Sequence, residues 1–526
     1  MGPPAPLSAH AATGEQYAVS AGCREAASAA LECLKSGGNV VDAAIAGSAV
    51  LCVVLPHAVT IGGDLFALVK LRAQPMAAVN ASGAAPRAAS IENFAARGLK
   101  LVPLIGPLSI QTPGLVAGWQ ALAERWASRP MAELLAPAIA YARGGFDIGE
   151  RLAQCIGAAK DESWEIPGWR EVFAPQGRCL GAGGRFVQPG LARTLERIAA
   201  GGAAAFYTGP VARDMARSVR RAGGVMTEED LQAVRAVETR PLSVEYGGLE
   251  ICTQPPISQG AILLRALGIL QRRAPDARAL PERKLWTHAA RALRTAFRER
   301  LALLGDEEDS FEKAVEMIAG RALPARHSRA AAHAGPETTT LSIMDAQGNA
   351  VSIIQSVFAD LGSGVIARES GVLFNNRLSA FFLDPSHPNH LAPGRRTMHT
   401  LHSFVASDAD GPVWAGGSPG GDNQPQVNLQ LLARLVARGE APAAAVEAPR
   451  WAIQPGTAPS DLAGERALCE PLLPKDVIEA LGAAGFAPVL APAASIGSAK
   501  VVGRVAGRKA VGAWSDRRRD GAALAA

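Results

Sequence analysis

The hydrophobic period of the sequence changes near residue 336, and this change restricts the possible folds more than any other feature. Before it, apolar residues recur at helical spacing, most clearly in Ser20–Val50, which Gly37 and Gly38 divide into two predicted helices, and in Pro281–Gly305. After it, apolar and polar residues alternate as in strands. The strands that we expect are Thr338–Asp345, Asn349–Phe358, Ser363–Asn375, Leu401–Ser407 and Pro412–Pro419. The sequence therefore predicts an α+β fold, mainly helical in its first two-thirds and rich in sheet thereafter.

Charged residues are few and dispersed, which leaves enough apolar residues for a large core. Only 19% of the residues are charged, and the formal net charge is +5. The densest basic run, Arg517–Asp520, lies close to the C-terminus and contains no aromatic residue. We interpret it as a solvated tail and expect no nucleic-acid partner.

The cysteines and the apolar stretches indicate the compartment. The seven cysteines form no CxxC pair, which favours reduced thiols, and the N-terminus has no secretory pattern. The most apolar stretch, Ala43–Pro56, is short for a membrane span, so we expect a buried helix there. These features predict a soluble cytoplasmic protein with no membrane partner.

Motifs for metals and nucleotides are missing from the sequence. The nine histidines form no HExxH pattern, and the chain has no phosphate-binding or dinucleotide-binding glycine motif and no GxSxG elbow. We therefore expect no metal and no organic cofactor.

A hairpin around the polar loop Asp345–Asn349 brings two hydroxyl groups together. If the loop closes symmetrically, Met344 pairs with Ala350, and the same register places Thr338 directly opposite Ser356. Cross-strand partners have Cβ atoms about 4.5–5.5 Å apart. The sequence thus predicts a contact between the Thr338 and Ser356 hydroxyls, provided that the register does not slip.

A threonine hydroxyl inside a chain is a poor nucleophile because nothing removes its proton. At the start of a chain, its own α-amine, with a pKa of about 7.7–8.0, can act as the base. The stretch 321–337 has no sustained apolar face, and we interpret it as a mobile, exposed connector in which the chain can be cut before Thr338. The alternative is that Thr338–Thr340 form an ordinary edge strand.

Two further segments contain candidate site residues. Gly416–Asp422 follows a predicted strand, and its paired glycines can present backbone N–H groups to an oxyanion, although such doublets also form ordinary tight turns. His399 is either a general base or a hydrogen-bonded loop histidine, because the residues around it fit both readings.

The hairpin resembles the start of the small subunit of the γ-glutamyltranspeptidase family, which are N-terminal nucleophile (Ntn) hydrolases. The resemblance rests on Thr338, "DAQGNAVS", Gly362-Ser363-Gly364 and Asn375-Asn376. It covers nearly the whole chain, since further landmarks follow in the family's order: "GGNVVDAAIA", "IGGD", "TPGLVAGW", "AFYTGPVA", "GGVMTEEDL", "QPPISQG", "GSPGGD" and "EAPRW".

This resemblance implies an αββα sandwich made as one precursor and cut autocatalytically between Glu337 and Thr338. Residues 1–337 would form the large subunit and 338–526 the small subunit, possibly within a dimer of these. Thr338 would be the nucleophile and Ser356 the neighbouring hydroxyl. Gly420 and Gly421 would supply the oxyanion-hole amides.

The chain departs from the family pattern at residues that recognise the γ-glutamyl group. Ile91 stands where the family has an arginine, and Phe358 replaces an asparagine. Arg377 and Ala380 replace a glutamine and an aspartate, and His399-Thr400 replaces a serine pair. An arginine suits a carboxylate through bidentate hydrogen bonds. Arg377, His399 and Thr400 are therefore the predicted substrate-binding residues, unless Arg377 points to solvent or pairs with a neighbouring acid.

The variant motifs look closest to the oxamate amidohydrolase branch of this family. They imply an amidohydrolase that cleaves a small amide-bearing acid through a threonine acyl-enzyme. One alternative is a γ-glutamyltransferase or glutathione hydrolase that recognises glutamate through other residues. A second is an uncleaved relative that binds a ligand without catalysis.

Overall fold

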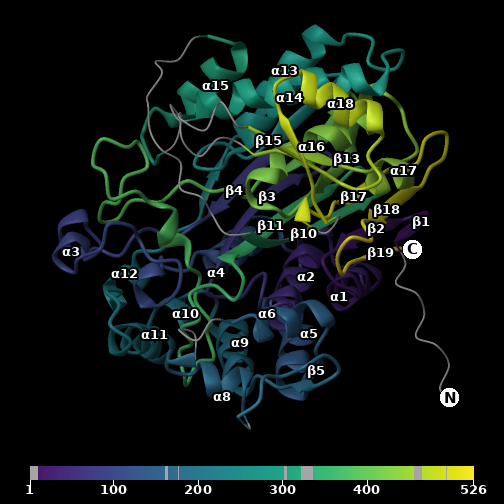
Figure 1. Cartoon of the computed structure of the whole chain (residues 1–526). Helices are drawn as coiled ribbons and strands as arrows, with labels where there is room; N and C mark the ends of the chain where they lie inside the picture. The colour runs from purple at the N-terminus through teal and green to yellow at the C-terminus, as the bar shows by residue number, and fades with distance from the viewer. Residues whose placement is uncertain are drawn as a thin grey trace.

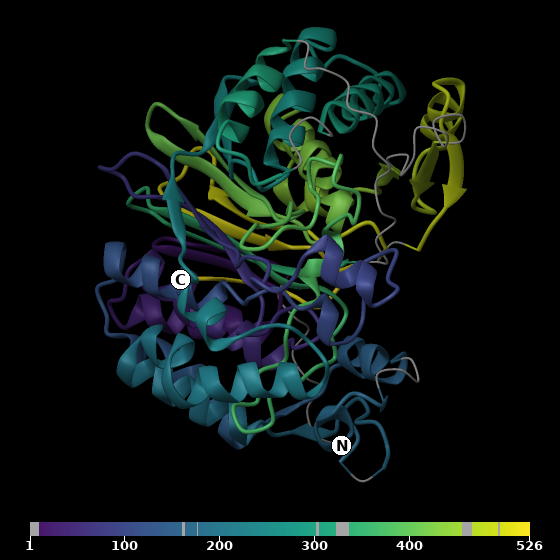
Figure 2. The same cartoon turned by 90° about the vertical axis from the view of Figure 1, so that its left-hand side faces the viewer.

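Two seven-stranded sheets lie face to face at the centre of the molecule, and helices cover the outer face of each (Figures 1 and 2). The computed structural model describes residues 10–159, 164–175, 177–300, 305–321, 336–454, 465–492 and 495–526. The four layers confirm the predicted αββα sandwich.

Both sheets combine strands from the two sides of residue 337. The upper sheet has the order β1 (Ala11–Gly14), β18 (Val511–Ser515), β17 (Lys500–Arg504), β13 (Gly411–Gly417), β12 (Ser403–Asp408), β9 (Leu249–Thr253) and β8 (Leu242–Tyr246). The lower sheet has the order β19 (Ala522–Ala525), β2 (Tyr17–Ala21), β10 (Pro336–Asp345), β11 (Ala350–Ala359), β3 (Asp64–Lys70), β4 (Ala77–Ala81) and β7 (Val237–Thr239). The hairpin that contains Thr338, β10–β11, is central in the lower sheet.

The helices form two groups (Figure 1). Under the lower sheet lie α1 (Arg24–Lys35), α2 (Val40–Val54), α4 (Leu115–Trp126), α5 (Met131–Gly144), α6 (Glu150–Gly157), α8 (Trp169–Phe173), α9 (Pro189–Gly201), α10 (Ala204–Tyr207), α11 (Gly209–Arg221) and α12 (Glu228–Gln232). Over the upper sheet lie α13 (Gly260–Arg273), α14 (Glu282–Glu299), α15 (Ser310–Ala319), α16 (Gln424–Leu432) and α18 (Lys475–Ala483). Every residue of α2 is buried, because this helix packs on β10 and β11 and is itself covered by α1 and α5.

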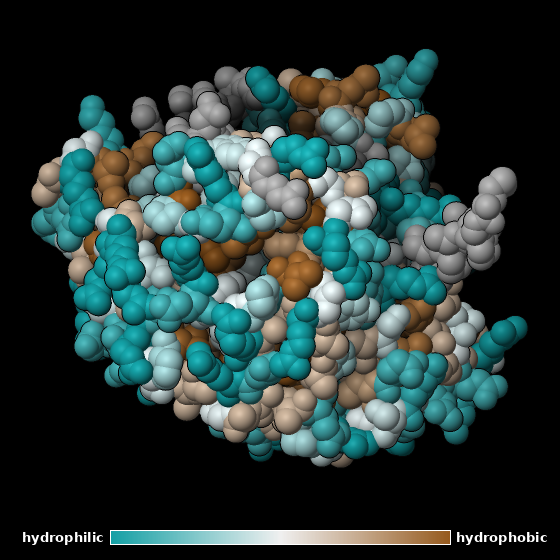
Figure 3. Space-filling view, turned by 90° about the horizontal axis from the view of Figure 1, so that it is seen from below, coloured by the Kyte–Doolittle hydropathy of each residue, from teal (hydrophilic) through white to brown (hydrophobic). Residues whose placement is uncertain are grey.

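Smaller elements lie at the margins of the sandwich. They are α3 (Ile91–Ala96), α17 (Pro442–Glu447), a two-stranded sheet of β5 (Phe146–Asp147) and β6 (Arg185–Phe186), and a three-stranded sheet of β14 (Trp451–Ile453), β15 (Arg466–Cys469) and β16 (Ala487–Leu490). Seen from below, hydrophilic side chains alternate with small hydrophobic patches (Figure 3).

Several predicted elements are confirmed. The two helices separated by Gly37 and Gly38 are α1 and α2, and the helix predicted in Pro281–Gly305 is α14. Four of the five predicted strands correspond to β10, β11, β12 and β13. The apolar stretch is the buried helix α2, and no described helix is long and apolar enough to cross a membrane. All seven cysteines are free.

The prediction that the first two-thirds would be mainly helical is wrong, because this part also supplies β1–β4 and β7–β9 to the sandwich. The strand β3 shows why. Its sequence, DLFALVK, is buried at all but its last residue, so its apolar residues do not alternate with polar ones. A short continuous apolar run of this kind cannot be distinguished from a helical segment by its period.

The predicted strand Ser363–Asn375 is also wrong. The chain there forms only isolated bridges, Gly62 with Phe374 and Ile366 with Leu373. Gly364 and Gly371 have φ values of 75° and 70°, which bend the backbone away from an extended path.

The basic run near the C-terminus is not a solvated tail. The side chain of Arg518 is 8% exposed and forms ion pairs with Glu470 and Asp516, and the following residues enter the lower sheet as β19. The sequence did not reveal this, because Glu470 lies far away along the chain. Most of the predicted connector, 322–335, lies outside the described residues.

Candidate active site

Thr338 lies at an irregularity in the β10–β11 hairpin. From Met344–Ala350 to Thr339–Gln355 the register is the predicted one, but Glu337 then pairs with Phe358, so the register shifts at Thr338. The predicted direct pairing of Thr338 with Ser356 is therefore wrong. A bulge re-aims the side chain of the extra residue. Here the two hydroxyls still meet, since Thr338 Oγ1 donates a hydrogen bond of 3.3 Å to Ser356 Oγ.

Ser356 connects the Thr338 hydroxyl to the peptide bond before it. The Ser356 hydroxyl is fully buried and donates a 2.6 Å hydrogen bond to the carbonyl oxygen of Glu337. It also accepts a 2.7 Å hydrogen bond from the Phe358 N–H. A donor on the Glu337 carbonyl polarises that group towards attack, while the Thr338 hydroxyl is held beside it.

The glycine pair after β13 lies next to the hairpin. Gly420 and Gly421 have φ values of 128° and 57°, a region that favours glycine, and the short turn that begins at Gly421 packs against β10. Pro419, directly before them, lines the same pocket as Thr338. Neither glycine N–H forms a hydrogen bond with another described residue. Two unpaired amides beside a hydroxyl form an arrangement that can stabilise an oxyanion.

Arg377 is buried beside the two hydroxyls. Its side chain is 1% exposed, and its guanidinium carbon lies 4.3 Å from the centre of the Phe358 ring. None of its three guanidinium nitrogens forms a hydrogen bond among the described residues. Arg377 thus does not point to solvent. Its nearest acid is Asp64, with 3.7 Å between Nε and Oδ2, so the alternative that it pairs with a neighbouring acid holds as a loose ion pair only.

His399 and Thr400 extend this buried polar cluster. His399 Nε2 is 2.7 Å from Ser82 Oγ and 3.6 Å from Asp64 Oδ2, while its Nδ1 has no partner among the described residues. The Thr400 hydroxyl is buried and likewise unpaired within the described chain. The Gln259 side-chain amide donates to the carbonyl oxygens of both Thr400 and Gly421, which fixes the cluster relative to the glycine pair.

Burial sets the charge states in the cluster. It raises the pKa of Asp64 to about 7, against the opposing effect of Arg377 and of the backbone N–H of Gly83. It lowers the pKa of Arg377 to about 10, so the guanidinium stays charged at neutral pH. Burial, together with the Arg377 charge, lowers the pKa of His399 well below its usual value, so this imidazole is neutral. The cluster contains one persistent cation and one acid that titrates near neutrality.

The hydroxyl pair and the cation cluster are joined through the lower sheet. Asp64 is the cross-strand partner of Ser356, so their side chains lie on the same face of the sheet. Asn375 accepts a hydrogen bond from the Arg377 N–H, and Asn376 accepts one from Ala359 at the end of β11. The structure therefore brings Thr338, Ser356, Arg377 and His399 into one region.

Sequence reasoning missed three residues of this region: Asp64, Ser82 and Gln259. Asp64 and Gln259 lie within the landmarks "IGGD" and "QPPISQG" but had no assigned role. A signal for Asp64 existed, because an acid that begins a fully apolar strand is rarely buried without a partner. Ile91 packs in the apolar cluster of Phe94 and Leu378, so no cation comes from that position.

The titration of Asp64 gives a testable pH dependence for an anionic substrate. Below about pH 7 Asp64 is mostly neutral, and the Arg377 charge is available to a substrate carboxylate. Above it the ionised Asp64 competes for Arg377, so we expect KM for an anionic amide to rise by roughly tenfold between about pH 6 and about pH 8. The Asp64→Asn variant should show a flat KM over this range. A wild-type KM that is independent of pH would contradict the assignment.

The comparisons with known proteins agree in kind. The family profile described as "Gamma-glutamyltranspeptidase" matches residues 26–526. The oxamate amidohydrolase proenzyme of Klebsiella pneumoniae is 34% identical over 447 residues, covering 81% of this chain and 83% of that protein. A glutathione hydrolase-like proenzyme of Bacillus subtilis is 33% identical over 434 residues, covering 80% of this chain and 81% of that protein.

A solved structure extends the similarity to three dimensions. The cephalosporin acylase from Bacillus halodurans has a TM-score of 0.87 and 29% sequence identity, and the match covers 100% of this chain and 98% of that one.

Proposed function

This chain belongs to the γ-glutamyltranspeptidase family, and we propose that it is a self-cleaving amidohydrolase whose substrate is a small, oxamate-like anionic amide. Its relatives are amidohydrolases and glutathione hydrolases, so the chain is an amide hydrolase or acyltransferase of this family. The observation that carries the choice of substrate is the buried Arg377, whose nitrogens have no hydrogen-bond partner in the described chain and lie beside the hydroxyl pair. A buried guanidinium without a partner is costly, and a carboxylate matches its geometry.

Maturation would proceed through the hydroxyl pair. Thr338 Oγ1 attacks the carbonyl carbon of Glu337, the C–N bond breaks, and the hydroxyl proton ends on the released α-amine. Water then hydrolyses the ester, which leaves Glu337 with a new carboxylate and Thr338 at the start of the second fragment. Since each sheet uses strands from both fragments, the fragments would stay together as large and small subunits.

Turnover would use the amine that maturation releases. The α-amine of Thr338 takes the hydroxyl proton, and Oγ1 attacks the amide carbon of the substrate. Ammonia leaves with that proton, the acyl-enzyme oxyanion is stabilised by Gly420 and Gly421, and water completes the hydrolysis. Arg377, with His399 and Thr400 beside it, would bind the substrate carboxylate.

The Ser356 hydroxyl should matter for both steps. Ser356→Ala should slow cleavage and hydrolysis by about 100-fold, because one positioned proton-handling group is lost. Ser356→Thr keeps the hydroxyl and should be mild. The measurements are the cleavage rate on a denaturing gel and kcat for ammonia release. Unchanged rates in Ser356→Ala would show that the contact is idle.

A γ-glutamyltransferase or glutathione hydrolase is the second candidate, favoured by one observation. Asp64 lies 3.7 Å from Arg377, so an amino-acid substrate would find an acid for its ammonium and a base for its carboxylate. The raised pKa of Asp64 counts against this, because the ammonium needs the ionised form. An ammonia-release screen over oxamate and related amides, alongside release of the anilide from a γ-glutamyl anilide, separates the two. Higher kcat/KM for the γ-glutamyl compound would overturn our proposal, and an intact chain inactive on both would indicate a non-enzymatic relative.

A further inference from the structure

The side chain of Glu337, directly before the nucleophile, is buried. Glu337 is 4% exposed, although glutamates are almost never buried unless they are paired. Its carboxylate contacts two arginines: Arg151 donates to Oε1, and Arg519 Nη1 donates to Oε2 at 2.6 Å. Each carboxylate oxygen thus has its own guanidinium.

The two arginines come from distant parts of the chain. Arg151 lies in α6 under the lower sheet, and it also forms an ion pair of 3.2 Å with Asp360, directly after β11. Arg519 lies between β18 and β19. Together they hold the start of β10 against both neighbouring segments, and all of these groups adjoin the pocket that contains Thr338.

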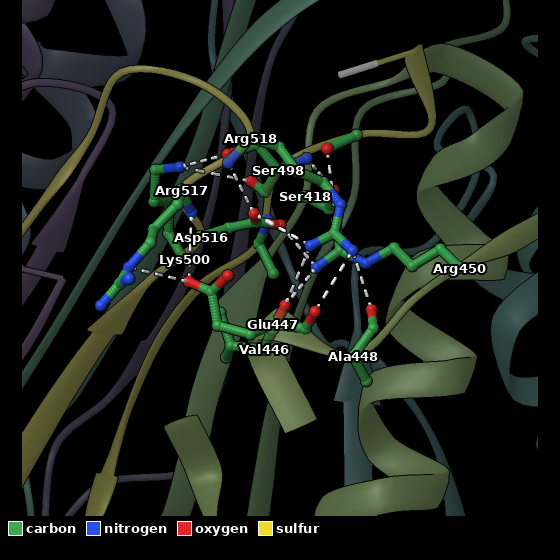
Figure 4. Close-up of polar contacts among 12 residues, drawn as sticks. Ser418, Val446, Glu447, Ala448, Arg450, Ser498, Lys500, Asp516, Arg517 and Arg518 are labelled. Carbon is green, nitrogen blue, oxygen red and sulfur yellow. Dashed lines mark hydrogen bonds and ion pairs between the residues drawn. The ribbon is translucent and has the colours of Figure 1, made fainter. Parts of the chain in front are cut away.

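The segment that carries Arg519 is itself fixed by buried ion pairs (Figure 4). Asp516 is fully buried and pairs with Arg450 at 2.6 Å and with Arg518 at 3.1 Å. Arg518 also pairs with Glu470 at 2.6 Å. The close-up shows Arg450 and Arg518 converging on Asp516. The position of Arg519 is therefore set by its neighbours in the chain.

The clamp fixes the peptide bond that Thr338 would attack. The Glu337 carbonyl is bound by the Ser356 hydroxyl, and the Glu337 side chain is bound by the two arginines. With both ends of the residue held, the carbonyl carbon cannot rotate away from Thr338 Oγ1. Holding reacting atoms in position in this way accounts for a large part of the rate of an intramolecular reaction.

We propose that Arg151 and Arg519 form a clamp on the Glu337 carboxylate that sets the rate of self-cleavage. This inference rests on the maturation step proposed above. Arg151 and Arg519 are positioning residues, since they touch the side chain of the residue to be cut and not the reacting atoms. Charge, and not only shape, is recognised, so the clamp distinguishes glutamate from glutamine before the nucleophile.

The test follows precursor cleavage after pulse-labelling in a cell-free translation, with the folded fraction isolated by gel filtration. Glu337→Gln and Arg519→Gln should each slow cleavage by about 10- to 100-fold, as expected for a misplaced reacting group. The double variant Glu337→Gln/Arg519→Gln should be no slower than the slower single variant, because both changes remove one contact. Once cleaved, all three should hydrolyse the substrate at the wild-type rate per molecule. Arg517→Gln, an exposed arginine two residues away, is the matched control and should cleave normally.

The outcomes separate the clamp from the maturation step itself. If wild-type precursor is not cut, the proposed maturation fails. If wild type is cut and the folded single variants are cut equally fast, or if the double variant shows the product of the two separate effects, the clamp is overturned. A loss of thermal stability without a change in cleavage rate would reduce these residues to a structural role.

Discussion

Thr338→Ala protein should remain a single chain of 526 residues and lack amidase activity. Without the hydroxyl, nothing attacks the Glu337 carbonyl, and no acyl-enzyme forms on the substrate. Loss of a nucleophile lowers kcat by about 10⁴- to 10⁶-fold in enzymes of this type. The measurements are a denaturing gel and a continuous assay of ammonia release from oxamate.

Two variants control this experiment. Thr338→Ser keeps a hydroxyl and should still be cut. Thr339→Ala removes the neighbouring hydroxyl, which lies towards Gly22 on the other side of the strand, and it should be cut and active. Cleavage at 337–338 in Thr338→Ala would mean that another group is the nucleophile.

Arg377→Gln should lower kcat/KM for oxamate by about 100-fold, mainly through KM. Hydrogen bonds to a charged group contribute about 1.5–3 kcal/mol, and each 1.4 kcal/mol is about tenfold in affinity. Arg377→Lys keeps the charge but loses the planar fork, so its loss should be intermediate. Cleavage of the precursor should proceed in both variants, because the clamp and the hydroxyl pair do not involve residue 377.

Thr400→Val is a milder companion to this experiment. The Thr400 hydroxyl is unpaired within the described chain, so its removal costs only whatever it donates to the substrate. If Arg377→Gln treats oxamate as wild type does, the carboxylate is bound elsewhere and the proposed substrate class is wrong.

The hairpin was predictable from the sequence because its turn chemistry and alternation are local. Thr338 and Ser356 could be brought together by counting residues from the turn. The bulge at Thr338 could not be foreseen, because the carboxylate clamp that holds Glu337 depends on Arg151 and Arg519, which are distant in the chain.

The environment of Arg377 was only half predictable. Its substitution for a neutral residue of the family pattern suggested a carboxylate site. Its burial against the Phe358 ring, and the acid Asp64 beside it, depend on strand β3, which shows no alternation and resembles a helical segment. Residues brought together by tertiary packing leave no periodic signal.

The central claim is that Thr338 becomes the first residue of a chain and acts there. It is tested most directly by N-terminal sequencing of the smaller fragment of purified wild-type protein. We predict a fragment that begins Thr-Thr-Thr-Leu-Ser, together with a larger fragment that ends at Glu337. A protein that stays intact after prolonged incubation at neutral pH, or a fragment that begins at another residue, would contradict the account.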